Sequence, residues 1–342
     1  MPSNGKKVIV TGGAGYIGSH TVVELSHAGY EPIIVDNFVN AERSAIEGIE
    51  HILQHKVKVY EGDCAEKSLL EKVYTNEGEI SGIIHFAAYK AVGESVTLPL
   101  KYYRNNIDTL LSLLEVSAAH DTAQLVFSSS CTVYGQPDSL PVTEKSPKKP
   151  AESPYGNTKQ ICEEILEDNY KSKAAIKAIA LRYFNPIGAH PSAAIGELPL
   201  GVPNNLVPFV TQTAAGIREK LTVFGDDYDT PDGTCVRDYI HVVDLAKAHV
   251  SALQYLERQS NPFYDVFNIG TGQGNTVLDV IKTFEQVCDT RLNYTIGNRR
   301  PGDVEKVYAD VAKSNQELGW KAELTLADSL KDAWCWQQAL KK

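Results

Sequence analysis

Apolar and polar residues alternate along this chain in two patterns. Short, nearly continuous apolar runs are typical of strands buried on both faces, and segments with apolar residues every three or four positions are typical of amphipathic helices. The apolar runs span residues 8–10, 32–36, 57–63, 82–88, 124–130, 176–184 and 264–272, and helical spacing is found at 16–29, 69–74 and 109–119. Strands that alternate with helices predict crossover connections, and therefore an α/β fold with a doubly wound parallel sheet of the Rossmann type.

The alternation stops after Phe184. The next stretch, "NPIGAHPSAAIGELPLGVPNNLVP", is rich in proline, glycine and asparagine and predicts irregular loops, which commonly carry binding residues on a rigid scaffold. We therefore expect a Rossmann domain at residues 1–185 and a smaller, mixed α/β substrate-binding domain at 186–342. The segment 236–272 is expected to return to the first domain, because it ends in another apolar run.

Composition and charge exclude several classes of protein. The 342 residues are 43% hydrophobic and 22% charged, as is ordinary for a globular protein, and the net charge of −10 argues against a nucleic-acid binder. No apolar stretch is long enough to span a membrane, and the N-terminal residues reach the first strand without an apolar leader. The six cysteines are scattered without CxxC spacing, so we expect reduced thiols, no metal site and a cytoplasmic protein.

The stretch "VTGGAGYIGSH" places glycines at positions 12, 15 and 18, where the first strand turns into the first helix. In a dinucleotide-binding turn the first glycine permits the sharp bend, the second lets the backbone approach the pyrophosphate, and the third lets helix and strand pack closely. The N-terminus of the following helix offers free N–H groups and a positive dipole end to the phosphates. The motif in this context predicts a phosphate cradle.

An acidic residue, Asp36, ends the second strand 18 residues after the last of these glycines. A carboxylate there would accept hydrogen bonds from the adenosine ribose hydroxyls and repel a 2′-phosphate. We therefore predict NAD rather than NADP as cofactor. The alternative is that Asp36 is only a turn residue at a strand end.

Tyr155 and Lys159 in "SPYGNTK" are four residues apart and share one face if this segment is helical. They follow the strand that ends in "SSS" (128–130), and ligands of such sheets bind at the C-terminal ends of strands. A lysine cation and a positive nicotinamide ring would both lower the pKa of the phenol from about 10, which predicts a base that takes a proton from an alcohol. Ser130 could hydrogen-bond the reacting oxygen. The alternative is a packed aromatic and a solvated charge.

These motifs together resemble the extended short-chain dehydrogenase/reductases and, more closely, the UDP-glucose 4-epimerase family. The stretches that carry the resemblance are "VTGGAGYIGSHT", "HFAAYKAVGES", "FSSSCTVYG", "YGNTK", "LRYFNPIGAHPS", "GTCVRDYIHVVDLA" and "RRPGDV", which run from residue 10 to about 310. The resemblance implies an NAD-dependent isomerase that inverts carbon 4 of the hexose in UDP-glucose and UDP-galactose through a transient 4-keto sugar. It also implies a homodimer and a role in galactose metabolism.

The same resemblance implies which residues form the site. Catalysis would rest on Tyr155, Lys159 and Ser130. The cofactor would contact Gly12, Gly15, Tyr16, Ile17, Gly18, Asp36, Asn37, Asn40, Asp63, Cys64, Phe86, Ala87, Ala88, Lys90, Asn105, Ser128, Tyr155, Lys159 and Tyr183. The UDP-sugar would contact Lys90, Ser130, Tyr155, Phe184, Asn185, Asn205, Leu206, Thr222, Phe224, Arg237, Arg300, Asp303 and Val307.

Val307 bears on the range of substrates. In the family this position, the fourth after the Asp of "RRPGD", is a large aromatic in members restricted to plain hexoses and a smaller residue in members that also accept N-acetylated ones. Valine here implies that UDP-GlcNAc and UDP-GalNAc are also interconverted. The alternative is that Tyr308 fills the space or that a loop closes it.

Two other functions stay open from the sequence. A nucleotide-sugar dehydratase of the same family would need an acid and a base beside the serine, and here Ser130 is followed by "CTVY" without an Asp-Glu pair. A non-catalytic NAD-sensing module could dispense with Tyr155 and Lys159, and this chain has both.

Overall fold

A seven-stranded parallel sheet forms the larger part of the molecule. The structure, a computed structural model, describes residues 5–300 and 303–340. The strands are β1 (Lys7–Thr11), β2 (Glu31–Asp36), β3 (Lys58–Glu61), β4 (Gly82–His85), β5 (Gln124–Ser128), β6 (Lys177–Tyr183) and β11 (Phe263–Ile269). They lie in the order β11-β6-β5-β4-β1-β2-β3, and every neighbouring pair is parallel. Each strand coincides with one of the predicted apolar runs, so the predicted doubly wound sheet is confirmed.

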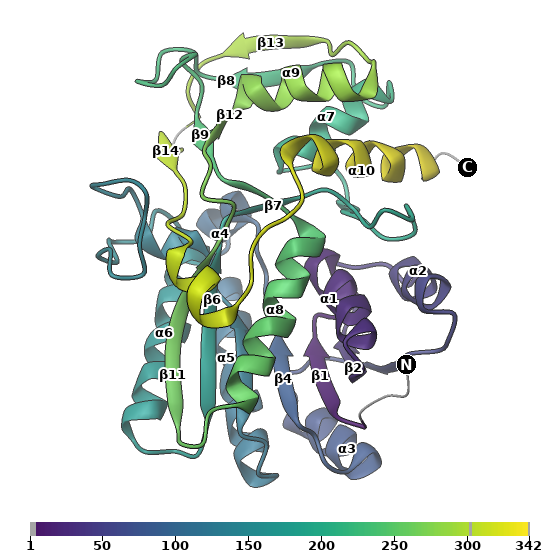
Figure 1. Cartoon of the computed structure of the whole chain (residues 1–342), viewed down its shortest axis with the longest axis vertical. Helices are drawn as coiled ribbons and strands as arrows, with labels where there is room; N and C mark the ends of the chain where they lie inside the picture. Colours follow the sequence, from purple (N-terminus) through teal and green to yellow (C-terminus); the bar gives the residue numbers. More distant parts are fainter. Residues whose placement is uncertain (1–4, 301–302, 341–342) are drawn as a thin grey trace.

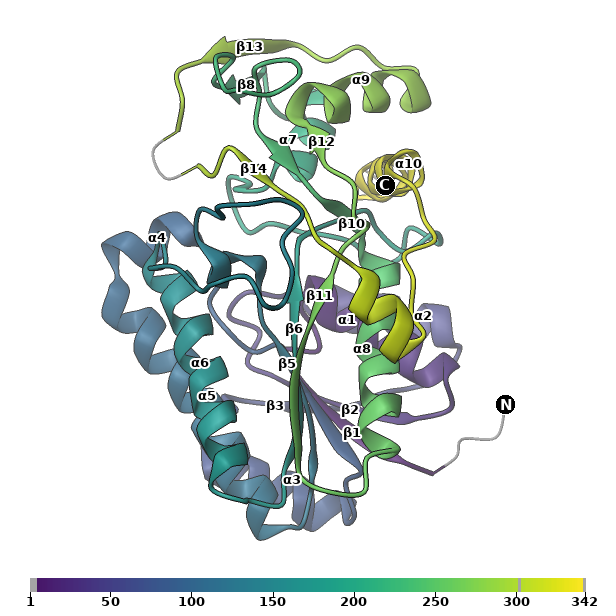
Figure 2. The ribbon, with the colours of Figure 1, turned by 60° about the vertical axis from the view of Figure 1, so that its left-hand side comes forward.

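Helices cover both faces of this sheet, as Figures 1 and 2 show. One face carries α1 (Tyr16–His27), α2 (Ser44–Leu53) and α8 (Val242–Glu257), and the other carries α3 (Lys67–Glu77), α5 (Pro99–Ala119) and α6 (Pro154–Lys171). Alternate residues of a strand serve the two cores: Val8 and Val10 pack toward α1 and α8, whereas Ile9 packs toward α3 and α5. This double burial explains why the strands are apolar at nearly every position.

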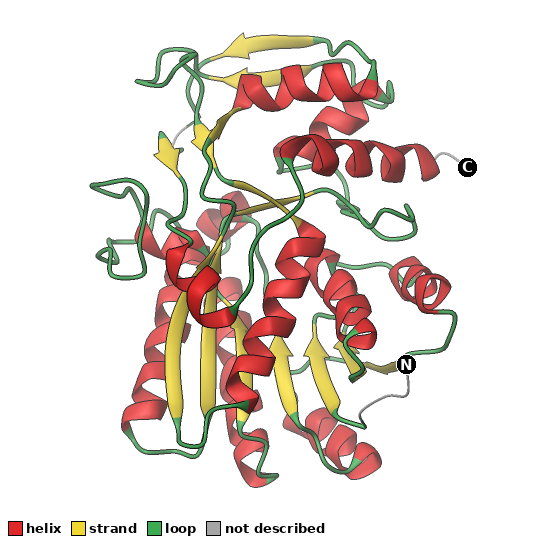
Figure 3. Ribbon diagram, viewed as in Figure 1, coloured by secondary structure: helices red, strands yellow, loops and turns green. Residues whose placement is uncertain are grey.

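Three small sheets and three helices form the rest of the molecule, beyond the C-terminal ends of the large sheet's strands (Figure 3). β7 (Asn185–Ile187) pairs with β10 (Tyr239–His241), β8 (Leu221–Phe224) pairs with β13 (Tyr294–Gly297), and β9 (Val236–Arg237) lies between β12 (Asn275–Thr276) and β14 (Lys306–Val307). The helices are α7 (Leu206–Ala214), α9 (Val277–Cys288) and α10 (Leu326–Ala339). Their apolar faces meet in a separate core that includes Val210, Phe284 and Leu330.

Two short helical segments follow strands of the large sheet in the chain. They are α4 (Val92–Thr97), after β4, and a 3₁₀ helix at Cys131–Tyr134, after β5. A π-helical turn, Ser314–Leu318, packs near α8 and β11. None of the helices in the described parts of the chain combines the length and the apolar character needed to cross a membrane.

Candidate functional site

A cavity of about 890 Å³ lies between the C-terminal edge of the large sheet and the small sheets above it. All of the residues predicted to contact the cofactor line it, from the glycine turn at 12–18 to Tyr183. It is also lined by Asn185, Asn205, Arg237, Arg300, Asp303 and Val307, which were predicted to contact the UDP-sugar. The fold therefore gathers residues that are up to about 300 positions apart in sequence around one space.

The turn between β1 and α1 has a backbone that only glycine fits. Gly12 has a φ of +68°, and a Cβ at this position would lie 2.8 Å from the backbone nitrogen of Ala87. A Cβ at Gly18 would lie 2.2 Å from the carbonyl oxygen of Gly12. Gly15 precedes the first residue of α1, and no side chain caps that helix end. The result is a close-fitting backbone cradle with the positive end of a helix at the cavity, which fits an anionic group.

Asp36 sits at the end of β2, buried beside this turn. Its carboxylate accepts hydrogen bonds from the backbone nitrogens of Ala14 and Phe38, each at 2.9 Å. Burial raises the pKa of Asp36, and the two hydrogen bonds oppose that shift. Asp36 therefore braces the glycine turn as well as lining the cavity, a structural role that the sequence did not reveal.

Helix α6 carries the predicted catalytic pair. Ser153 caps this helix by accepting from the backbone nitrogen of Gly156 at 3.1 Å, and Pro154 is its first residue. The Lys159 ammonium donates to the carbonyl oxygen of Ser128 at 2.6 Å and lies 5.9 Å from the centre of the Tyr155 ring. The predicted helix is confirmed, and it places both side chains on the cavity wall.

Burial dominates the electrostatics of this pair in the chain alone. Burial raises the pKa of Tyr155 above its usual value, with Tyr183 adding to the effect and a hydrogen bond from Ser130 opposing it. Burial also lowers the pKa of Lys159 to about 8. Burial therefore disfavours the phenolate in the chain without cofactor, and the lowering of the Tyr155 pKa by Lys159 together with a positive nicotinamide ring stays a prediction for the complex with NAD.

A buried ionic network, which no sequence motif marks, supports the turn that follows β5. The carboxylate of Glu163 accepts from the hydroxyl of Ser129 at 2.6 Å and from both Nε and an Nη of Arg182 at 2.9 and 2.6 Å. Glu163 and Arg182 are almost completely inaccessible to solvent. Removing one ion of this pair would leave a buried charge without its partner, which is strongly destabilising. The pair is therefore a fixed point, and the bond from Ser129 to Glu163 holds the turn that contains Ser130.

The upper part of the cavity carries two arginines that share one carboxylate. Arg300 donates to Asp303 through Nε at 3.1 Å and through an Nη at 2.7 Å, and an Nη of Arg237 lies 3.9 Å from the same carboxylate. Residues 301 and 302 of the "RRPGD" motif lie outside the described residues. Guanidinium groups of this kind match phosphate oxygens in a bidentate fork, so this wall fits a phosphorylated ligand.

Five predicted substrate residues are not among those that line the cavity: Ser130, Phe184, Leu206, Thr222 and Phe224. Ser130 and Phe184 are buried, the first at the start of the 3₁₀ helix and the second in an apolar cluster with Val307. Leu206 begins α7, and Thr222 and Phe224 belong to β8. The Phe224 ring is half-exposed and lies 5.7 Å from the Arg300 guanidinium, so it borders the arginine wall from outside.

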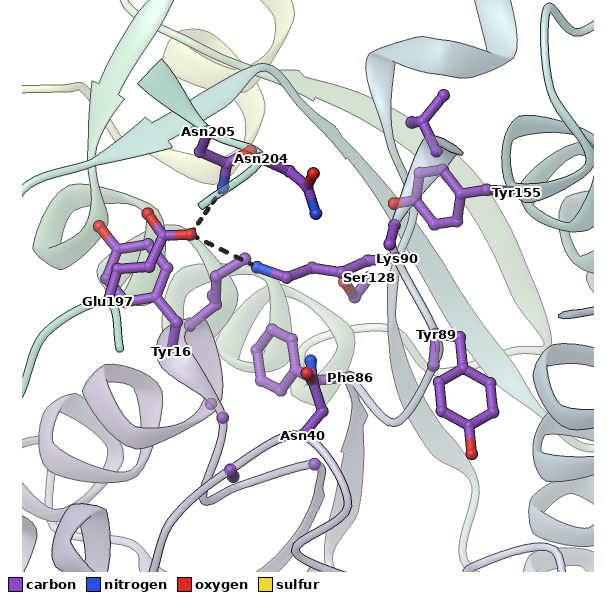
Figure 4. Close-up of a pocket in the computed structure, with 18 of the residues that line it drawn as sticks. Tyr16, Asn40, Phe86, Tyr89, Lys90, Ser128, Tyr155, Glu197, Asn204 and Asn205 are labelled. Carbon is purple, nitrogen blue, oxygen red and sulfur yellow. Dashed lines mark hydrogen bonds and ion pairs between the residues drawn. The ribbon is translucent and has the colours of Figure 1, made fainter. Parts of the chain in front are cut away.

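The structure also places residues at the cavity that the sequence did not single out, namely Tyr89, Glu197, Asn204 and Trp336. Figure 4 shows Glu197 facing Lys90 across the cavity. Its carboxylate accepts from the Asn205 amide at 2.6 Å and lies 3.7 Å from the Lys90 ammonium. No motif marks Glu197, because a single acidic residue in an irregular segment is usually a solvated surface group.

No group of three or more His, Cys, Asp and Glu side chains within residues 5–300 and 303–340 is arranged to hold a metal ion. The polar groups of the cavity are instead a backbone cradle, a buried phenol–ammonium pair and an arginine wall.

Comparisons with known proteins agree with this geometry. Residues 9–333 match the family model described as GDP-mannose 4,6 dehydratase. The UDP-glucose 4-epimerase of Dictyostelium discoideum is 50% identical over 331 residues, which cover 97% of this chain and 95% of that protein. A crystal structure of UDP-glucose 4-epimerase from Bifidobacterium longum in complex with NAD+ and UDP is 47% identical, with a TM-score of 0.93 and 98% coverage of both chains. UDP-glucose 4-epimerase from Stenotrophomonas maltophila, with bound NAD and formylated UDP-arabinopyranose, is 44% identical with a TM-score of 0.95, over 98% of this chain and 99% of that one.

Proposed function

We infer that this chain inverts carbon 4 of the hexose in UDP-glucose and UDP-galactose, because it belongs to the UDP-glucose 4-epimerases. These enzymes are members of the extended short-chain dehydrogenase/reductase family. One observation carries the proposal: the Tyr155–Lys159 pair lies on the wall of a cavity that has a dinucleotide cradle at one end and an arginine wall at the other. This arrangement suits a reaction that needs a nucleotide cofactor and a diphosphate-linked alcohol in one space.

The cavity fits NAD as the cofactor. Gly12 and Gly18, where a Cβ would meet backbone atoms of the chain itself, let the turn close tightly, and the uncapped start of α1 would then receive the pyrophosphate. Asp36 and Asn37 would hold the adenosine ribose, and Lys90 and Tyr183 would lie toward the nicotinamide end. When bound, NAD supplies a hydride acceptor that returns the same hydride, so the reaction passes through a transient 4-keto sugar and needs no second substrate.

The chain's own residues would then hold the sugar nucleotide and move its proton. Tyr155, as the phenolate that the Lys159 ammonium and a positive nicotinamide ring would favour, would take the proton of the C4 hydroxyl and return it, with Ser130 close by to orient the reacting oxygen. Arg237 and Arg300 are placed to grip the diphosphate by exchanging their contact with Asp303 for phosphate oxygens. The UDP portion is thus held firmly while the hexose remains able to turn.

A dehydratase is the rival enzyme of the same fold, and the description of the matching family model names one. Elimination of water needs an acid and a base beside the serine, but Ser130 is followed by Cys131 and Thr132. Incubation with UDP-galactose separates the candidates. An epimerase forms UDP-glucose, a dehydratase forms a 4-keto-6-deoxy sugar nucleotide, and an NAD-sensing module leaves the substrate unchanged.

We propose that UDP-GlcNAc and UDP-GalNAc are also substrates. Val307 lines the cavity and belongs to a buried apolar cluster with Phe184 and Val133. The Tyr308 ring packs instead against Gly274, where a Cβ would lie 3.1 Å from it, and Tyr308 is not among the cavity residues. An acetamido group therefore has the space that an aromatic ring at position 307 would occupy.

Asp36→Ala is expected to weaken NAD binding and to reduce discrimination against NADP. The substitution removes the carboxylate that would pair with the ribose hydroxyls and repel a 2′-phosphate. It also removes the hydrogen bond from Ala14 that braces the glycine turn and the one from Phe38 after β2. Kd values for NAD and NADP, measured on cofactor-free protein, check this. Loss of the brace alone would weaken the binding of both cofactors equally and leave the ratio of the two Kd values unchanged. An unchanged ratio would therefore show that Asp36 does not distinguish the two riboses.

We propose that two copies of the chain form a homodimer and that the protein is cytoplasmic. Within each copy we place the boundary between the two domains near residue 185. Three exposed leucines on and beside α5 support the association: Leu98, Leu100 and Leu111 are 50%, 80% and 39% exposed. The six cysteines are unpaired, as expected in a reducing compartment. Size-exclusion chromatography with light scattering should give twice the 37.5 kDa mass of one chain, and a mass of one chain would contradict the dimer.

A further inference from the structure

Glu197 is the one carboxylate that links the two proposed ligand-binding walls of the cavity within the described residues. Lys90, which follows β4, is predicted to contact both the cofactor and the UDP-sugar, and Asn205, which precedes α7, is predicted to contact the UDP-sugar. The Glu197 carboxylate accepts from Asn205 at 2.6 Å and lies 3.7 Å from Lys90 (Figure 4). It therefore engages two donors that are both predicted to contact the UDP-sugar.

The backbone around Glu197 is held in place independently of this carboxylate. The carbonyl oxygen of Glu197 accepts from the indole N–H of Trp336 at 3.0 Å. The preceding residue, Gly196, lies flat on the same indole, where a Cβ would be 2.5 Å from the ring. Helix α10 thus fixes the backbone of this segment independently of the charge on Glu197.

The Asn205 amide is turned away from the role that its position favours. Asparagine at the start of a helix normally accepts a hydrogen bond from the first turn, but Asn205 makes no such bond with α7. Its side chain donates to Glu197 instead. The first turn of α7 has no side-chain cap, and the NH₂ group of Asn205 is engaged by an anion.

We propose that the Glu197 carboxylate limits the affinity of the cavity for UDP. The proposal rests on the proposed function and on the prediction that Lys90 and Asn205 contact the sugar nucleotide. A diphosphate that approaches these donors is repelled by the negative charge of the Glu197 carboxylate. Only 12% of the Glu197 side chain is exposed, so water screens that charge incompletely. An enzyme that binds its substrate mainly through UDP binds its product equally tightly, because both carry UDP. The repulsion therefore favours release of the product.

The test is Glu197→Gln, which removes the charge and keeps an oxygen that can accept from Asn205. Lys90 is 48% exposed, so its ion pair contributes little to stability and the variant should fold. Isothermal titration of the NAD-loaded protein should give a Kd for UDP about tenfold lower than that of the native protein at low ionic strength. The difference should shrink as salt is added, because screening weakens a charge effect but not a packing effect.

Three controls make the result specific. Uridine, which has no phosphates, should bind both proteins equally. Glu197→Asp keeps the charge and should bind UDP with an affinity close to native. Glu79→Gln changes the net charge identically at an exposed residue outside the cavity and should bind UDP as the native protein does.

UDP binding to Glu197→Gln that is unchanged or weaker would overturn the proposal, as would an equal gain for uridine. A native protein that binds no UDP would overturn the proposed function itself. A native protein that binds UDP, with no gain in Glu197→Gln, would leave the proposed function standing and remove only this role of Glu197.

Discussion

Tyr155→Phe is expected to lower kcat for UDP-galactose by at least about a hundredfold, the usual contribution of a general acid–base group. The substitution keeps the ring, which is 8% exposed on the cavity wall, and removes only the hydroxyl. That hydroxyl is the proton carrier of the account, and nothing else at the position can replace it. Ser130 keeps its hydrogen bond from the backbone nitrogen of Thr132 at 3.2 Å.

A stopped assay of UDP-glucose formation at saturating substrate measures this effect. NAD content and melting temperature should match those of the native protein, because no cofactor-cradle residue is changed. Tyr170→Phe is the matched control: Tyr170 lies near the end of the same helix, is 41% exposed, and should tolerate loss of its hydroxyl without change in turnover. Turnover of Tyr155→Phe within a few-fold of native would remove Tyr155 from its role.

Val307→Tyr is expected to abolish turnover of UDP-GalNAc and to spare turnover of UDP-galactose. Val307 is 6% exposed, pairs through β14 with Arg237, and belongs to a buried apolar cluster with Phe184, which does not line the cavity. A tyrosine ring cannot enter that packed cluster, since overpacking a core costs typically about 1–3 kcal/mol. The ring must therefore extend into the cavity, into the space that the acetamido group needs.

Parallel assays with the two substrates measure the change as a ratio of kcat/KM values. Val307→Ala is the control at the same position, because it enlarges the space and should keep both activities. A native protein that does not turn over UDP-GalNAc, or a Val307→Tyr variant that still does, would contradict the volume argument.

Sequence periodicity predicts the large sheet because burial on both faces makes its strands apolar at nearly every position. β1, β2 and β6 read as strands for this reason, and the glycines at 12, 15 and 18 identify the β1–α1 turn. The small sheets escaped prediction because their strands are only two to four residues long and pair with segments far away in sequence. β9, for example, contributes two residues and pairs with both β12 and β14, which no local pattern can indicate.

The candidate site divides in the same way. Tyr155 and Lys159 are predictable because the helical repeat places them on one face of a helix. That helix also follows β5 in the chain, and ligands of such sheets bind at the C-terminal ends of the strands. Glu197 and the Glu163–Arg182 network depend on long-range packing and have no sequence signature. The sign of the Tyr155 pKa shift was also beyond the sequence, because spacing shows that a lysine is near but not that both groups are buried.

The central claim is that this chain epimerises carbon 4 by moving one hydrogen off the sugar and back. The most direct measurement is incubation of the protein with UDP-galactose in D₂O, with no cofactor added beyond that bound during purification, followed by mass and NMR analysis of the product. The account predicts UDP-glucose that carries no solvent deuterium on the ring carbons. The absence of UDP-glucose, or deuterium at a ring carbon of the product, would contradict it.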